Sequence, residues 1–78
     1  MNHKLLRGVI KRTGKKYEAL AKECNMDRGT LYNKCYGLTE FKLSEIEALS
    51  KALHLTVEQK ILIFFNQEVI YIHDYDKR

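Results

Sequence analysis

The chain has 78 residues, enough for one small domain, and it contains no Pro and only four Gly. A sandwich or barrel of many strands needs turn-forming residues that this composition lacks, so we expect a helical bundle. The net charge is +4, but residues 1–42 carry ten Lys or Arg against four acids, whereas residues 43–78 carry four against six. This asymmetry fits an N-terminal half that faces a polyanion, and it fits an ordinary lysine-rich surface equally well.

Two helices are predicted in the first 25 residues. The first covers residues 4–12, where apolar side chains recur at helical spacing: Leu5, Leu6, Val9 and Ile10. A second, short helix follows, and its apolar positions are Tyr17, Leu20, Ala21 and Cys24. Asn25 should end this helix, because Asn tolerates the left-handed backbone conformation that a tight turn requires.

A third helix is predicted over residues 28–36. Asp27 is expected to cap its start, because the carboxylate can accept hydrogen bonds from backbone N–H groups two or three residues on, and Gly37 is expected to end it. Leu31 and Cys35 then share the face that meets the core. The opposite face is unusual in its residues, which are Arg28, Gly29, Tyr32, Asn33 and Tyr36.

Two further helices and a tail are predicted in the second half. A fourth amphipathic helix begins between residues 42 and 44, with apolar positions Leu43, Ile46, Leu49, Ala52 and Leu53. Thr56 and Gln59 resemble a capping box that opens a fifth helix, whose apolar stripe is too wide for so small a core to bury completely. Residues 67–78 form a tail, in which residues 69–72 could be a strand or a continuation of the helix.

The segment from Tyr17 to Gly37 places a short helix, a turn at residues 25–27 and a second helix in the order of a DNA-binding helix-turn-helix unit. Its Leu20-Ala21 and Thr30-Leu31 pairs, with Gly37, resemble the motif of the Cro/lambda-repressor (XRE-type) family. Tyr17 departs from a Gln that many members carry, and Asn25 departs from the usual turn Gly. The resemblance implies an all-α, five-helix lambda-repressor-like DNA-binding domain in residues 1–66.

The same resemblance implies which positions contact DNA. The base-reading positions are Arg28, Gly29, Tyr32 and Asn33. Arg can pair with guanine, Asn with adenine, and a Tyr ring can lie against a thymine methyl, while Gly lets the backbone approach closely. The phosphate-contacting positions are Tyr17, Tyr36, Thr39 and Lys42, and the nearby Lys15 and Lys16 could add positive charge. The alternative for Tyr32 and Tyr36 is a role in packing alone.

We therefore expect a transcriptional regulator, a repressor of the phage or mobile-element kind, that binds a pseudo-palindromic operator in double-stranded DNA as a homodimer. Dimerisation is expected through the fifth helix and the tail, at Phe64, Phe65, Val69 and Tyr71, with one of the two Phe rings in the core and the other at the dimer seam. The alternative function is a protein-binding modulator of the anti-repressor type, which captures another regulator protein. That alternative predicts a more apolar outward face on the third helix.

Other residue types predict neither catalysis nor a ligand. Cys24, Cys35 and the three His residues lack the short spacings typical of zinc sites, and no Cys-His or Ser-His-Asp set is evident. We therefore expect no enzyme activity, cofactor, metal or small-molecule ligand. With two Cys and no signal-peptide-like start, a reduced, cytoplasmic protein is expected. The longest apolar run, residues 61–65, is far shorter than the about 20 residues that a membrane-spanning helix needs.

Overall fold

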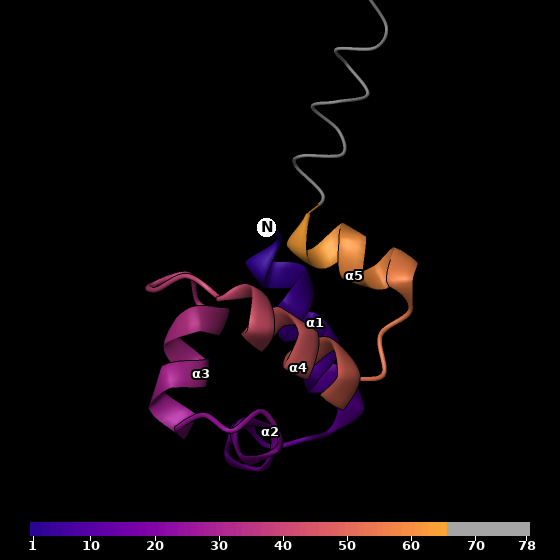
Figure 1. The fold of residues 1–78 in the computed structure, drawn as a ribbon. Coiled ribbons are helices and arrows are strands. Elements are labelled where there is room, and N and C mark those ends of the chain that lie inside the picture. Colours follow the sequence, from indigo (N-terminus) through magenta and orange to yellow (C-terminus); the bar gives the residue numbers. More distant parts are fainter. Residues whose placement is uncertain (66–78) are drawn as a thin grey trace, which may run out of the picture.

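The computed structural model describes residues 1–65, which form five helices and no strand. The helices are α1 (His3–Thr13), α2 (Tyr17–Glu23), α3 (Arg28–Cys35), α4 (Leu43–Ala52) and α5 (Val57–Phe64). In Figure 1, α4 lies in front of α1, α2 and α3 lie at the lower left, and α5 lies at the top beside the N-terminus. The predicted all-α fold is confirmed. The tail, residues 67–78, with its strand-or-helix alternative, lies outside the described residues.

The helix ends follow from local hydrogen bonds. α1 begins one residue earlier than predicted because the side chain of Asn2 accepts a hydrogen bond from the N–H of Leu5 at 2.9 Å. Gly14 ends α1 in the left-handed conformation, with φ +76°. The predicted capping box of α5 is confirmed: the N–H of Gln59 donates to the Thr56 hydroxyl at 3.1 Å, and the N–H of Thr56 donates to the Gln59 side chain at 2.8 Å.

The turn between α2 and α3 is closed by backbone geometry. Asn25 has φ 59°, the left-handed conformation predicted for it, and the N–H of Met26 donates to the carbonyl of Ala21 at 2.8 Å. Asp27 occupies the N-cap position of α3, but its side chain accepts no capping hydrogen bond. The predicted position of the cap is therefore confirmed, and its predicted side-chain hydrogen bond is wrong. Asp27 is exposed, so water can solvate its carboxylate in place of a backbone N–H. Exchanging one hydrogen-bond partner for the other changes the free energy of folding little.

The core is one apolar cluster to which every helix contributes. Its largest fully buried side chains are Leu6, Ile10, Leu20, Leu31, Leu49, Ile63 and Cys35. Leu31 and Cys35 of α3 are both 0% exposed, which confirms the predicted inward face of that helix. The periodicity placed Leu43 on the apolar stripe of α4, but its side chain is 65% exposed. Leu43 is the first residue of the helix, and the first residue of α4 that is buried in the core is Ile46.

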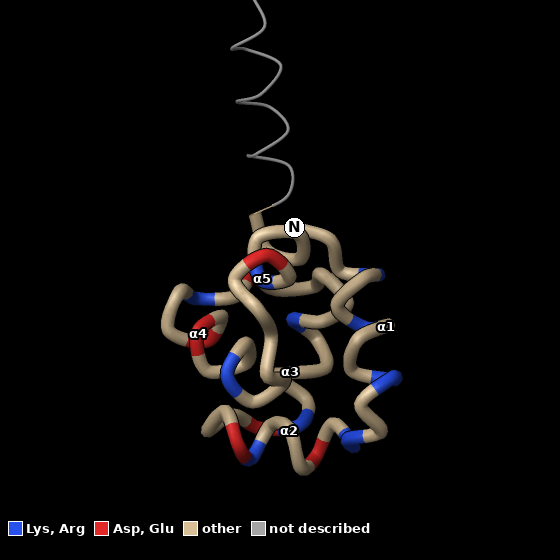
Figure 2. Tube along the Cα trace, turned by 90° about the vertical axis from the view of Figure 1, so that its right-hand side faces the viewer, with Lys and Arg blue, Asp and Glu red and all other residues tan. Residues whose placement is uncertain are grey.

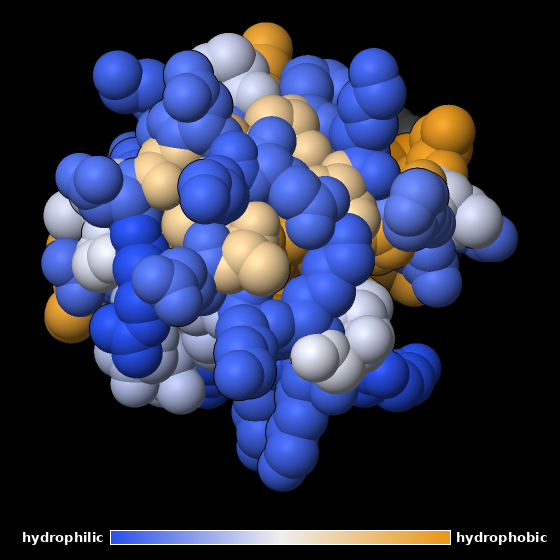
Figure 3. Space-filling model, turned by 90° about the horizontal axis from the view of Figure 1, so that it is seen from below, coloured by the Kyte–Doolittle hydropathy of each residue, from blue (hydrophilic) through white to orange (hydrophobic). Residues whose placement is uncertain are grey.

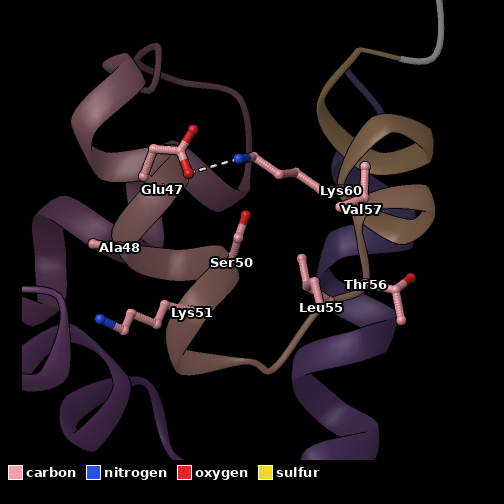
Figure 4. A pocket seen from close by; sticks show the side chains of 8 residues that line it. All are labelled: Glu47, Ala48, Ser50, Lys51, Leu55, Thr56, Val57 and Lys60. Carbon is pink, nitrogen blue, oxygen red and sulfur yellow. Dashed lines mark hydrogen bonds and ion pairs between the residues drawn. The ribbon is translucent and has the colours of Figure 1, made fainter.

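A groove between α4 and α5 is crossed by an ion pair. In Figure 4 the side chains of Lys60 and Glu47 meet across it, and their charged atoms are 2.6 Å apart. The buried Ser50 side chain projects between the two helices, and its hydroxyl has no hydrogen-bond partner among the described residues. The ion pair therefore ties α5 to α4 at a partly exposed site, where such pairs contribute less than about 1 kcal/mol.

Gly37→Ala should destabilise the protein more than Gly14→Ala. The two glycines have φ +79° and +76°, so Ala at either position adopts a left-handed conformation that costs about 1–2 kcal/mol. A Cβ at Gly37 would also lie 3.3 Å from the ring of His3, whereas a Cβ at Gly14 meets nothing within 4 Å. Urea denaturation of both variants measures the difference. Equal losses would show that the His3 ring moves aside without cost.

Candidate nucleic-acid interface

Helix α3 turns a polar face to solvent. The residues of the predicted base-reading face, with Tyr36 beside it, are all exposed: Arg28, Gly29, Tyr32, Asn33 and Tyr36. They recur three to four residues apart, so they form adjacent rows on one side of the helix. The structure therefore brings the four predicted base-reading residues together on one accessible surface.

Three tyrosines form a row across α2 and α3, which we call the tyrosine row: Tyr17, Tyr32 and Tyr36. The ring centroid of Tyr32 is 5.4 Å from that of Tyr17, edge to face, and 4.5 Å from that of Tyr36, with the planes tilted by 32°. Tyr32 is nevertheless 40% exposed and Tyr36 45% exposed. The rings thus pack against one another and also remain accessible. A role in packing is therefore compatible with a contact to DNA for Tyr32 and Tyr36.

Arg7 of α1 belongs to this surface, although it is not among the residues that the sequence predicted to contact DNA. Its Nη1 atom donates to the backbone carbonyl of Cys35 at 3.1 Å, and its guanidinium carbon lies 4.3 Å from the centroid of the Tyr36 ring. At the other end of the tyrosine row, the guanidinium carbon of Arg28 lies 6.0 Å from the centroid of Tyr32. No local pattern could have identified Arg7, because its partners are far along the chain.

The hydroxyls of Tyr17 and Tyr32 are hydrogen-bond donors at neutral pH. Burial raises the pKa of Tyr17 above its ordinary value of 10.0, and the side chain of Tyr36 is the main cause that raises the pKa of Tyr32. Both hydroxyls therefore keep their protons. Tyr17, at the start of α2, can donate to a phosphate oxygen, which is the role predicted for this position.

The two lysines that precede α2 have different roles. The Nζ atom of Lys15 donates to the carbonyl of Ala52 at 2.8 Å and pairs with Glu23 at 3.0 Å. The phosphate contact of Lys15 stays a prediction, but its ammonium group is held between α2 and the end of α4, and a carboxylate offsets its charge. Lys16 is exposed and has no ion-pair partner in residues 1–65, so its charge is available.

A second groove lies beside the start of α3, between that helix and α2. Three bases line it, namely Lys16, Lys22 and Arg28, against the acids Glu18 and Asp27. Lys22 is another cation that sequence reasoning did not single out. Its position in the last turn of α2 does not indicate a contact with DNA, because a lysine there is equally explained by its favourable interaction with the helix dipole.

The loop that follows α3 is held by a largely buried ion pair. Lys34 is 8% exposed, and its Nζ atom lies 3.0 Å from Oε1 of Glu45 and donates to the carbonyl of Glu40 at 2.8 Å. The N–H of Lys42 donates to the same Glu45 oxygen at 2.7 Å. These contacts fix the loop that carries two predicted phosphate-contacting residues, Thr39 and Lys42, both of which are exposed.

The predicted dimer residues divide as follows. Phe64 is 5% exposed and packs edge to face on Phe41, with centroids 5.8 Å apart, so it is the one of the two Phe rings that lies in the core, and its ring is not available to a dimer seam. Phe65 is partly buried against the same core. The exposed apolar side chains of α5 are Val57 at 75%, Ile61 at 38% and Leu62 at 48%. Val69 and Tyr71 lie outside the described residues.

Charge is distributed unevenly over the surface. α1 contains four bases and no acid, whereas acidic residues occur in α2, α4 and α5 (Figure 2). Viewed from the α2 end, the surface is predominantly hydrophilic, with a paler hydrophobic strip between the charged side chains (Figure 3). The end of the molecule that carries α2 is thus mostly polar and charged.

Other kinds of site find little support in residues 1–65. Burial raises the pKa of Cys35 to about 12 and also raises that of Cys24, so both remain thiols and not nucleophilic thiolates. Within the same residues no group of three or more His, Cys, Asp or Glu is placed to hold a metal ion. None of the five helices described is long and apolar enough to cross a membrane.

No protein-family model, curated protein or solved structure matches this chain. Its function must therefore be inferred from the residues and geometry described above.

Glu45→Gln should lower stability in a pH-dependent way. The hydrogen bond from the Lys42 N–H, with Lys34 nearby, holds the pKa of the Glu45 carboxyl below its ordinary 4.5. The ionised carboxylate therefore stabilises the fold above pH 4.5, and this contribution disappears as the pH falls through the lowered folded-state pKa. We expect the variant to lose about 1–3 kcal/mol at neutral pH and progressively less on acidification.

Urea denaturation at several pH values measures this dependence. Glu47→Gln is the matched control, because Glu47 is 58% exposed in its pair with Lys60 and should contribute less. A stability difference for Glu45→Gln that stays constant from neutral to acid pH would mean that the charge of Glu45 plays no part.

Proposed function

We propose that the chain is a sequence-specific DNA-binding regulator that lays α3 in the major groove of double-stranded DNA. The observation that carries the proposal is the outward face of α3. This helix has 8 residues, and its opposite face is anchored by two side chains that are 0% exposed. A helix held in this way presents its polar side chains as a rigid set, and the major groove of B-DNA is wide enough to admit it.

The side chains of the face match the chemistry of base edges. Arg28 can hold O6 and N7 of guanine with two hydrogen bonds, and Asn33 can do the same with N6 and N7 of adenine. Packing does not explain Gly29, because a Cβ there would meet nothing within 4 Å and Ala would favour the helix. A glycine at that position fits a close approach of the backbone to DNA.

Cations lie on both sides of this face. Lys16 and Lys22 line the groove beside the start of α3. Arg7 and Lys42 lie near its end, where the Lys34–Glu45 pair holds the loop. Cations on both sides of a recognition helix can neutralise the phosphates that border the groove, which favours DNA over an uncharged partner.

We further propose that the protein acts as a homodimer on a pseudo-palindromic operator and represses transcription by occupying it. The support is the exposed apolar face of α5, which we call the α5 patch: Val57, Ile61 and Leu62. Contact between two such patches would bury apolar surface and present one α3 from each copy, and a two-fold dimer reads two half-sites of opposite orientation.

One observation favours the second candidate function, capture of another regulator protein. Leu38 is 72% exposed and Leu43 is 65% exposed, and both flank the loop after α3. Apolar side chains beside a polar face are typical of the centre of protein interfaces. The cations around α3 still favour DNA, and the experiment below separates the two functions.

Selection of bound sequences from a random duplex pool tests the proposal. We expect a palindromic sequence that the full chain binds about a thousandfold more tightly than unrelated DNA at near-physiological salt. Weak, salt-sensitive binding without enrichment of any sequence would instead favour the protein-binding function.

Two variants serve as internal controls in the titration. Arg28→Ala should lose discrimination at one base pair of each half-site and keep the weak, salt-sensitive binding. Lys16→Ala should weaken binding to all DNA about equally, because its side chain can contact only the backbone charge. Normal discrimination by Arg28→Ala would show that α3 does not read the bases.

Leu62→Glu should convert a dimer into a monomer. A carboxylate at the α5 patch would lose its hydration in the seam, whereas the side chain is 48% exposed in the single subunit, so the fold should be kept. Sedimentation equilibrium measures the mass, with Ser44→Glu as a control that adds the same charge at another exposed helical position. If Leu62→Glu still sediments as a dimer, the interface lies elsewhere.

A further inference from the structure

The ring of Tyr32 lies at the middle of the α3 face and is held there from both sides. Tyr17 meets it edge to face and Tyr36 lies against it, at 5.4 and 4.5 Å between centroids. The ring is still 40% exposed. Its environment therefore differs from that of a free surface tyrosine, because it cannot swing away without breaking both aromatic contacts. Whatever binds the α3 face meets a ring in a fixed position.

A fixed ring discriminates between the edges of bases. Guanine, cytosine and adenine present mainly hydrogen-bonding groups in the major groove, and a ring placed over these groups removes their water without replacing it. Thymine presents a methyl group on C5, which gains by contact with an apolar surface. The ring is thus complementary to a methyl group and unfavourable for the other edges.

The apolar ring is the part of Tyr32 that its neighbours hold in place. Both aromatic contacts are made by the ring, at 5.4 and 4.5 Å between centroids, and the neighbouring Tyr36 side chain raises the pKa of the hydroxyl, so that group stays neutral. Arg28, one helical turn earlier, and Asn33, the next residue, supply hydrogen-bonding groups on either side. The face therefore has one apolar reading position between two polar ones.

We propose that Tyr32 makes the operator require a 5-methylpyrimidine, which is thymine in unmodified DNA, at the base pair that faces the tyrosine row. This inference rests on the proposed DNA-binding function and specifies its substrate. A 5-methylcytosine carries its methyl on the same ring carbon, so it should replace thymine there better than cytosine does.

The test uses the full chain and the operator obtained by selection. Each thymine of a half-site is replaced in turn by deoxyuridine, which removes the methyl and keeps every hydrogen-bonding group. We expect one position to weaken binding by about fourfold per half-site, the effect of losing one buried methyl, and the other positions to change binding less. At that position, 5-methylcytosine should bind more tightly than cytosine.

Variants of Tyr32 assign the effect to the ring. Tyr32→Phe keeps the ring and should keep the preference for thymine over deoxyuridine. Tyr32→Ala should lose that preference and keep the discrimination that Arg28 provides at its own base pair. A thermal melt followed by circular dichroism checks that both variants are folded, and the deoxyuridine series on the unaltered protein tests the inference independently of them.

The outcomes are distinct. A specific operator that tolerates deoxyuridine at every position, or an undiminished thymine preference in Tyr32→Ala, would overturn this inference and leave the proposed function intact. Failure to select any operator would instead overturn the proposed function itself.

Discussion

The arrangement of the candidate interface depends on the burial of Leu31 and Cys35. Helix α3 has 8 residues, and isolated helices shorter than about 12–15 residues are marginal in water. Its stability must come from packing, and these two side chains, both 0% exposed, anchor it against the core. Because one face of the helix is used in this way, the opposite face must meet solvent. The exposure of Arg28, Tyr32 and Asn33 is thus a consequence of core packing.

Cations that bind backbone carbonyls join the helices around this anchor. Arg7 donates to Cys35, the last residue of α3, and Lys15 donates to Ala52, the last residue of α4. Carbonyls at helix ends have no partner within the helix and lie at the negative end of its dipole, so they suit a cation from another element. Lys15 is also paired with Glu23, so its charge serves the fold, whereas Arg7 has no ion-pair partner in residues 1–65 and its charge remains available to a polyanion. Lys34 has a similar role within the loop after α3.

The tyrosine row connects that scaffold with the proposed chemistry. It joins α2 to α3 through the contact between Tyr17 and Tyr32, and its far end lies under the guanidinium group of Arg7 from α1. Three helices thus share one aromatic surface, so their relative positions and the position of the exposed rings are coupled. A change in the packing of α1 or α2 should alter the face of α3 even where it does not alter the helix itself.

The sequence by itself determined the five helices, most of their ends and the outward face of α3, because periodicity and turn residues such as Asn25 act over a few neighbours. It also identified the exposed residues that α3 presents. Only the tertiary structure decided which cations are free and which apolar rings are buried. Lys15 and Lys16 are adjacent and chemically alike, yet one is bound to Ala52, and Phe64 could not be assigned to the core before its contact with Phe41 was known. These outcomes depend on partners distant in the chain, which local patterns do not encode.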